Sequence, residues 1–218
     1  MRNKIKELEQ KVWFKIIEYV MLAFLLGFIV MQVFFPNIIF KAQLDHRVKT
    51  DENYNVLNED YNIYTNMEMN DDLEELYNAY FNSKMKSLPL YENNYVIVVT
   101  DDVLSTSNPY TLKFVEDDYI ITANTNKMRK SIILHKGYIA SSFVHEVGHA
   151  VDNKYNFSKT EEFKALYDKI EHDDYLTSDI GEYFAEGYAL FVNGELYASD
   201  KELIEYYEGI LNTEYDFI

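Results

Sequence analysis

Residues 19–40, with the sequence YVMLAFLLGFIVMQVFFPNIIF, carry no charged side chain and are apolar on every side of a helix. At a rise of about 1.5 Å per residue, a helix of this length crosses a bilayer core of roughly 30 Å. Core helices of soluble domains are seldom apolar around their whole circumference over about six turns. The run therefore predicts a transmembrane segment between a short N-terminal tail and the body of the chain.

The same run favours a retained signal-anchor over a cleaved signal peptide. It exceeds the apolar core of a signal peptide, about 7–15 residues, and no A-x-A-like cleavage site follows it. The basic residues that flank it are Arg2, Lys4, Lys6, Lys11 and Lys15 before the run, and Lys41, Arg47 and Lys49 after it. Because basic residues gather on the cytoplasmic side, residues 1–18 are predicted to lie inside the cell and the body outside the cytoplasm.

The charge of the body excludes one class of partner. Residues 1–50 contain eight Lys or Arg and four Asp or Glu, whereas the remainder contains twelve and thirty-three, and the whole chain has a net charge of −17. A body this acidic repels phosphate backbones, so we expect no nucleic-acid binding. Because the chain has no cysteine, thiolate metal sites, disulfides and cysteine nucleophiles are excluded as well.

Beyond the apolar run, the sequence predicts a stalk followed by one α+β domain. Residues 41–69 are acidic, rich in Asn and Tyr and without a sustained period, which is typical of a linker. From residue 70 the periodicity becomes regular. The expected helices are 70–81, 139–153, 159–170, 181–193 and 201–211, and the expected strands are 95–99, 119–123 and 131–134. A small sheet followed by helices indicates an α+β domain over residues 70–218.

The pentapeptide HEVGH at residues 145–149 points to a metal site. His145 and His149 lie one helical turn apart on one face, where two imidazoles can reach a single cation. Glu146 is rotated by about 100° from His145, so it can face a metal-bound water instead of binding the metal. Gly148 costs about 1 kcal/mol relative to Ala inside a helix, and the close approach of another backbone would explain it.

A third ligand must come from elsewhere in the chain. In the extended motif H-E-x-x-H-x-x-G-x-x-H, the Gly and third His positions are occupied here by Asp152 and Tyr155. The stretch GEYFAEGYALF at 181–191 offers Glu182 as a ligand and Glu186, one turn later, as the acid that orients a ligating histidine. Glu182 also has a second interpretation, as part of an N-terminal capping pair with Asp179.

The residues HEVGHAVD (145–152), Tyr175 and EYFAE (182–186) together resemble the anthrax toxin lethal factor-like zinc metallopeptidases, a family that includes the secreted clostridial Pro-Pro endopeptidases. The similarity is strongest over residues 139–192 and does not include the membrane segment or the stalk. In that family, the two HExxH histidines and the first glutamate of the E-[FY]-F-A-E stretch hold one zinc ion. The tyrosine seven residues before that glutamate donates to the oxyanion.

For this chain, the resemblance implies a zincin-like metallopeptidase domain over residues 70–218 with one Zn²⁺ per chain. The implied ligands are His145, His149 and Glu182, the implied general base is Glu146, and Tyr175 is the implied electrophilic helper. The expected function is that of a membrane-anchored zinc endopeptidase outside the cytoplasm, which cleaves a protein or peptide substrate by a metal-activated water.

Several alternatives remain open at the level of sequence. The domain can be a catalytically inactive binding module on the same fold, because folds host several functions. It can also be a structural stalk protein with an accidental HExxH. The segment SIIL at 131–134 can be an edge strand that pairs with an extended substrate, or an interior strand. The lone His135 and His172 are expected to be surface or packing residues.

Overall fold

The computed structural model describes residues 2–58, 62–68, 74, 76, 90, 94–101, 123–170 and 179–212. Most of the helix predicted over 70–81 and of the strand predicted over 119–123 lies outside these residues. Within them, the protein consists of six α-helices, two short 3₁₀ helices and one small mixed sheet of five strands. The chain is thus a mixed α/β protein with one N-terminal apolar helix, which agrees with the predicted α+β class at this level.

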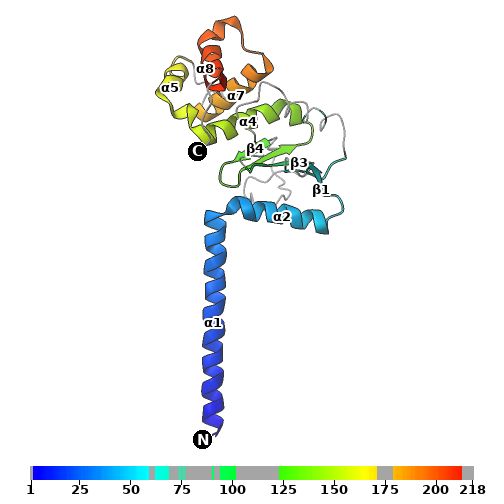
Figure 1. Cartoon of the computed structure of the whole chain (residues 1–218), viewed down its shortest axis with the longest axis vertical. Helices are drawn as coiled ribbons and strands as arrows, with labels where there is room; N and C mark the ends of the chain where they lie inside the picture. The colour runs from blue at the N-terminus through cyan, green and yellow to red at the C-terminus, as the bar shows by residue number, and fades with distance from the viewer. Residues whose placement is uncertain are drawn as a thin grey trace.

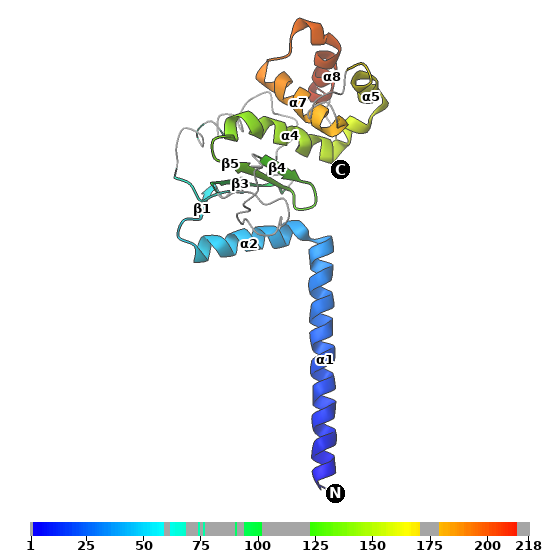
Figure 2. The same ribbon diagram turned by 180° about the vertical axis from the view of Figure 1, so that it is seen from behind.

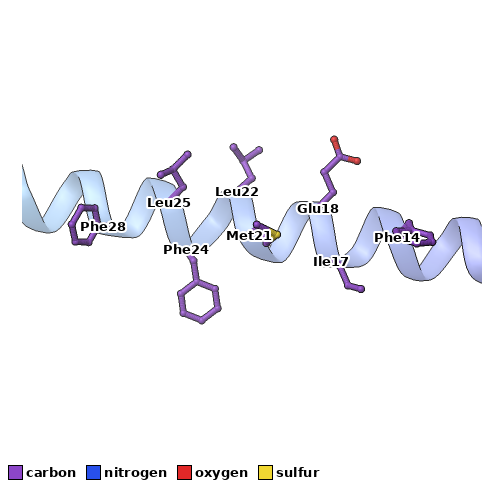
Figure 3. Close-up of a pocket in the computed structure, with 8 residues that line it drawn as sticks. All are labelled: Phe14, Ile17, Glu18, Met21, Leu22, Phe24, Leu25 and Phe28. Carbon is purple, nitrogen blue, oxygen red and sulfur yellow. The ribbon is translucent and has the colours of Figure 1, made fainter.

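The first helix, α1 (Arg2–Phe34), extends away from the rest of the protein (Figure 1). Its stretch Val12–Phe34 is long and apolar enough to be a membrane span or a signal sequence, and none of its most apolar window is buried. Figure 3 shows one side of α1, along which eight side chains project from the helix. The eight residues labelled there are Phe14, Ile17, Glu18, Met21, Leu22, Phe24, Leu25 and Phe28.

The predicted apolar run 19–40 does not form one continuous helix. The helix is interrupted at Phe35, where φ is −133° and ψ is 45°. A second helix, α2 (Pro36–Thr50), begins with Pro36 in its first turn. A proline in the interior of a helix clashes with the carbonyl four residues earlier, so Pro36 starts a new helix more readily than it continues the old one. The last five residues of the run therefore belong to α2 and not to the candidate span.

The five strands form one sheet in the order β1-β2-β3-β5-β4. Their bounds are β1 Asn55–Asn58, β2 Ile63–Thr65, β3 Val96–Thr100, β4 Ala123–Asn126 and β5 Ser131–His135. The pairs β1–β2 and β4–β5 are antiparallel, whereas β2–β3 and β3–β5 are parallel. The segment 131–134 is thus an interior strand, and the edge-strand interpretation is wrong. Among the described strands, β4 is the edge strand next to β5.

The prediction of a stalk over residues 41–69 is also wrong. Residues 41–50 lie in α2, and β1 and β2 are part of the sheet. In α2, Phe40 and Leu44 are buried, and all three residues of β2 are buried. Strands of three and four residues are too short to show the alternation from which a strand is predicted, which is why the sequence reads as a linker.

Helices cover both faces of the sheet (Figures 1 and 2). Because successive side chains of a strand point to opposite faces, alternate residues of β3 and β5 contribute to two separate cores. The core on the side of α2 consists of Phe40, Leu44, Tyr64, Val96, Val98 and Ile133. The larger core lies on the side of the helix α4 (Ile139–Tyr155) and includes Ile97, Val99, Ile132, Leu134, Phe143 and Val147.

Among the described residues, three further α-helices follow α4. They are α5 (Glu161–Tyr167), α7 (Ile180–Asn193) and α8 (Lys201–Asn212), and the 3₁₀ helices Phe157–Lys159 and Ala198–Asp200 precede α5 and α8. The positions of the four C-terminal helices predicted from the sequence are therefore confirmed. The residue that follows α4 is Asn156, with a φ of 57°, and the residue that follows α7 is Gly194, with a φ of 77°. A left-handed residue of this kind is a common way to end a helix.

Candidate metal centre

The packing of α4 against α7 brings together the two predicted halves of the site. A Cβ atom added to Gly148 would lie 2.8 Å from the Cα atom of Ala185, a distance that real Cβ atoms do not tolerate. Gly148 therefore permits the backbones of α4 and α7 to approach more closely than any other residue would allow. This contact confirms the explanation that the sequence suggested for a glycine in the middle of HEVGH.

The start of α7 shows that both interpretations of Glu182 apply, one to its backbone and one to its side chain. The Asp179 side chain caps the helix, since its Oδ1 accepts from the backbone N–H of Gly181 at 2.7 Å and of Glu182 at 3.2 Å. This cap needs only the backbone of Glu182. The Glu182 carboxylate can therefore point toward α4. The N-terminal cap and the contact of Glu182 with the histidines are thus compatible.

The Glu182 carboxylate lies between the two histidines of α4. Its Oε2 is 3.3 Å from His145 Nε2 and 3.4 Å from His149 Nε2. Donor atoms of these three residues all lie within 4.8 Å of one another. In tetrahedral coordination with metal–ligand distances of about 2.0–2.1 Å, neighbouring ligand atoms are about 3.3–3.4 Å apart. The donor set therefore fits a single metal ion, and His145, His149 and Glu182 can bind one.

Glu186 contacts the second ring nitrogen of His145. Its Oε2 is 3.0 Å from His145 Nδ1, while Nε2 of the same ring faces Glu182. When Nδ1 carries the proton and donates a hydrogen bond to Glu186, the lone pair of Nε2 is directed at the metal position. Glu186 lies one helical turn after Glu182, which is the arrangement that the sequence predicted for a ligand and the acid behind it.

Glu146 is a buried carboxyl group beside this donor set. The residue is 6 % exposed, and its Oε2 has no hydrogen-bond partner among the described residues. Burial raises the pKa of Glu146, while the neighbouring Thr125 hydroxyl and the nearby imidazoles of His149 and His145 act in the opposite direction. A carboxyl group with a raised pKa and an unpaired oxygen is suited to accept a proton from a polar group that enters the site.

The carboxylates around His145 favour its protonated form. Burial by itself would lower the pKa of His145, but hydrogen bonds to Glu182 and Glu186 and the nearby acidic charges raise it to about 9. The hydrogen bonds from His145 and His149 hold the pKa of Glu182 well below its ordinary value. His145 is thus protonated at neutral pH, between the carboxylates of Glu182 and Glu186, and a metal ion that binds this ring must displace a proton.

Of the remaining predicted residues, the structure describes Asp152 and His135, and neither belongs to the donor set. Tyr175 and His172 fall within residues 171–178, which are outside the described residues. Asp152 is not a ligand, because its carboxylate accepts from the backbone N–H and the hydroxyl of Ser158, each at 2.7 Å. His135 Nδ1 lies 2.9 Å from the carbonyl oxygen of Lys136, at the end of β5. Asp152 therefore fixes the turn after α4, and His135 is a lone histidine.

Thr125 is a residue of the site that the sequence did not indicate. Its hydroxyl donates to the backbone carbonyl of Glu146 at 2.9 Å, which ties the edge strand β4 to the middle of α4. The strand reads ANTN, a polar stretch with none of the β-branched alternation that predicts a strand, apart from Thr125 itself. Only the tertiary structure could reveal this contact.

No protein-family model matches this chain, and no curated protein matches it.

Proposed function

We propose that this protein is a zinc-dependent endopeptidase with a zincin-like domain, anchored to the membrane by α1 and located outside the cytoplasm. The observation that carries this proposal is the convergence of His145, His149 and Glu182 on one point, next to the buried carboxyl of Glu146. Among the described residues three protein ligands converge, a number typical of a catalytic metal site, whereas structural sites use four.

The donor chemistry supports zinc as the metal. Two imidazole nitrogens and one carboxylate oxygen form a mixed set that suits Zn²⁺, whereas Mg²⁺ and Ca²⁺ prefer oxygen ligands alone. The orientation of His145 by Glu186 adds the outer hydrogen bond that ligating histidines usually have. We propose one zinc ion per chain.

The proposed reaction is the hydrolysis of a peptide bond. A zinc ion bound here would act as a Lewis acid that lowers the pKa of water. Glu146 would accept a proton from the attacking water and return it to the leaving amine, and its raised pKa suits both transfers. By the family resemblance, the Tyr175 hydroxyl would donate to the oxyanion of the tetrahedral intermediate.

The sheet edge beside the site supports an extended substrate. Strand β4 is the last strand on its side among the described strands, and it is tied to α4 through Thr125 and Glu146. An exposed strand edge can bind an extended peptide through main-chain hydrogen bonds. We therefore propose a protein or peptide segment in extended conformation as the substrate, and no nucleic acid, given the acidic body.

Metal analysis of the full chain in mild detergent tests the proposal. We expect about one zinc per wild-type chain, much weaker zinc retention in Glu182→Gln, and unchanged zinc content in Glu146→Gln. His135→Gln is the matched control, because it removes a histidine that lies outside the donor set, and it should keep its zinc. A wild-type chain without zinc, or a His135→Gln variant that loses it, contradicts the proposed site.

Activity is tested on the same samples with a library of unstructured peptides. The wild type and His135→Gln should cleave, and Glu146→Gln should lose at least about a hundredfold in rate, as expected when a general base is removed. Zinc binding without cleavage of any peptide would favour the inactive binding module. Cleavage by Glu146→Gln at the wild-type rate would show that Glu146 is not the base.

A further inference from the structure

Helix α2 lies directly at the end of the candidate membrane span. Only Phe35 separates the end of α1 at Phe34 from the start of α2 at Pro36. In Figures 1 and 2, α2 lies across the base of the domain, and α1 leaves on the side of α2 that faces away from the sheet. If α1 crosses a bilayer, α2 must therefore lie at the surface of that bilayer, with its outer face toward the lipid headgroups.

The two faces of α2 differ in burial. Phe40 and Leu44 point into the core below the sheet, at 6 % and 3 % exposure. The exposed residues of α2 are Ile38, Lys41, Ala42, Gln43, His46, Lys49 and Thr50, and none of them is acidic. Ile38, Ala42, His46 and Lys49 follow one another at helical spacing. We call this side the outer face of α2.

The turn between β4 and β5 lies next to the end of α2 that joins α1. The Arg129 side chain is buried, with its guanidinium carbon 5.5 Å from the centre of the Phe40 ring. Two residues of this turn point outward, namely Lys127, which is exposed, and Met128, which is 63 % exposed. Figures 1 and 2 both place the turn near the junction of α1 and α2. An exposed methionine and a lysine are thus added to the base of the domain.

The base of the domain differs in charge from the rest of the body. After residue 50 the chain contains twelve basic and thirty-three acidic residues. Within α2, three basic residues stand against Asp45, which turns inward and accepts from the Tyr64 hydroxyl at 2.6 Å. Lys41 also donates to Asn62 of the β1–β2 connection. Within α2 these cations are therefore opposed by no exposed acidic residue, and exposed Glu52 follows the end of the helix by two residues.

We propose that the outer face of α2, together with Lys127 and Met128, docks onto the anionic surface of the bilayer that α1 crosses. Lysines near an anionic surface are attracted to it, and exposed Ile38 and Met128 can insert their side chains at the headgroup level. The acidic remainder of the body is repelled from the same surface, which favours a single orientation. This inference rests on the proposed membrane anchor and is independent of the proposed peptidase activity.

Docking of this kind sets where the metal centre can act. The metal centre is built by α4 and α7, and α4 packs on the face of the sheet opposite to α2. With α2, the sheet and α4 stacked in layers, the centre is held on the order of 20 Å above the bilayer surface. The accessible partner is then a segment that stands off the membrane, and segments directly at the bilayer, including residues 35–50 of this chain, are out of reach.

The absence of cysteine from the chain permits a direct test with single cysteine labels. The full chain is reconstituted in nanodiscs of equal parts phosphatidylcholine and phosphatidylglycerol, with an environment-sensitive fluorophore at Ala42→Cys or at Ser199→Cys. Ser199 is exposed on the 3₁₀ helix before α8 and provides the matched control. Nitroxide-labelled headgroups should quench the Ala42 label several-fold more than the Ser199 label, and iodide in the buffer should show the reverse order.

Charge reversal separates electrostatic docking from simple proximity. Lys49→Glu with Lys127→Glu should remove most of the headgroup quenching at Ala42, whereas Lys154→Glu with Lys159→Glu, an equal charge change on exposed residues elsewhere, should not. In nanodiscs of phosphatidylcholine alone, the quenching of the wild-type chain should also fall. Equal effects of both lysine pairs would overturn the proposal.

A third label distinguishes failure of docking from failure of the anchor. Gly27 lies in α1 with open space around it, so Gly27→Cys can be labelled without a clash. Quenching of the Gly27 label by acyl-chain nitroxides together with none at Ala42 by headgroup nitroxides would sink the docking proposal and leave the anchor intact. No quenching at Gly27 would overturn the anchor and the docking together. Shielding of Ala42 from iodide without headgroup quenching would assign this face to a second protein copy instead.

Discussion

At the scale of single residues, His145 is the most constrained side chain of the candidate metal centre. Both of its ring nitrogens face carboxylates, with Glu182 at 3.3 Å from Nε2 and Glu186 at 3.0 Å from Nδ1. The same acids that would hold a metal ion against this ring hold a proton on it in the metal-free protein. Proton and metal therefore compete for one nitrogen, and the raised pKa of His145 fixes the pH range of that competition.

Zinc affinity should consequently depend on pH. Below the His145 pKa of about 9 the metal must displace a proton, so affinity should fall as the pH is lowered, by about tenfold per pH unit from this one group. Above that pKa the contribution should level off. Competition with a zinc chelator on the full chain at several pH values between about 6.5 and 9 measures the slope. An affinity that stays constant over this range would contradict the assignment of His145 as a ligand.

Glu186 should act by positioning His145 and by nothing else. In Glu186→Gln we expect zinc affinity to fall by about 10- to 100-fold, as is typical when the outer hydrogen bond of a ligating histidine is changed. Because Glu186 helps to raise the pKa of His145, the pH dependence of zinc binding should also shift to lower pH. Glu195→Gln is the control, since Glu195 is exposed just after the end of α7. A loss of affinity without the shift in pH dependence would indicate a general structural effect.

At the scale of elements, the packing of α7 determines whether a site exists. Its Gly187 faces α8, where an added Cβ would lie 2.6 Å from the Tyr207 hydroxyl oxygen, and that hydroxyl donates to the carbonyl of Phe184 at 2.7 Å. On its other side, Ala185 meets Gly148 of α4. Two glycines thus hold α7 close to both neighbours, so a small shift of α7 would move Glu182 away from the histidines.

Substitution of Gly148 tests this dependence. In Gly148→Ala the helices α4 and α7 must separate, so we expect a destabilisation of about 1–3 kcal/mol from overpacking together with weaker zinc binding. The control is Gly209→Ala in α8, where an added Cβ meets nothing within 4 Å. That change should stabilise the protein by up to about 1 kcal/mol, because alanine is the better helix former. Thermal unfolding of both variants in detergent measures the difference, and a stabilised Gly148→Ala would show that the contact is not tight.

The assignment of α2 to the folded domain is tested in the same way. Leu44 is 3 % exposed between α2 and the sheet, so Leu44→Ala should cost about 2–5 kcal/mol. Gln43 is the exposed neighbour, and Gln43→Ala should change stability by less than about 0.5 kcal/mol. Unfolding midpoints that are equal for the two variants would mean that residues 41–50 form the linker that the sequence suggested.

At the scale of the whole molecule, the helices and the sheet are stacked in a fixed order from the candidate anchor to the candidate metal centre. The order from α1 through α2 and the sheet to α4 places the candidate anchor and the metal centre at opposite ends of the protein (Figure 1). A chain built in this way presents the candidate metal centre to whatever compartment the body occupies. The biological role of the site therefore depends on the orientation of α1.

Protease treatment of intact cells determines that orientation. With five basic residues before the apolar run, we expect the N-terminus to stay inside and the body to be cleaved from outside. A tag at the N-terminus should remain protected until the cells are lysed, which is the internal control. A body that stays uncut until lysis would place the domain in the cytoplasm and refute the proposed location.

The sequence by itself determined the features that depend on one helix at a time. The apolar run follows from its length and its lack of charge. The pairing of His145 with His149 and the pairing of Glu182 with Glu186 follow from the helical period, which places residues three or four apart on one face. Only the tertiary structure decided that the Glu182 carboxylate reaches both histidines, that Thr125 contacts Glu146, and that α2, β1 and β2 belong to the domain. These contacts join segments far apart in the chain, and short polar strands carry no local period from which such contacts can be predicted.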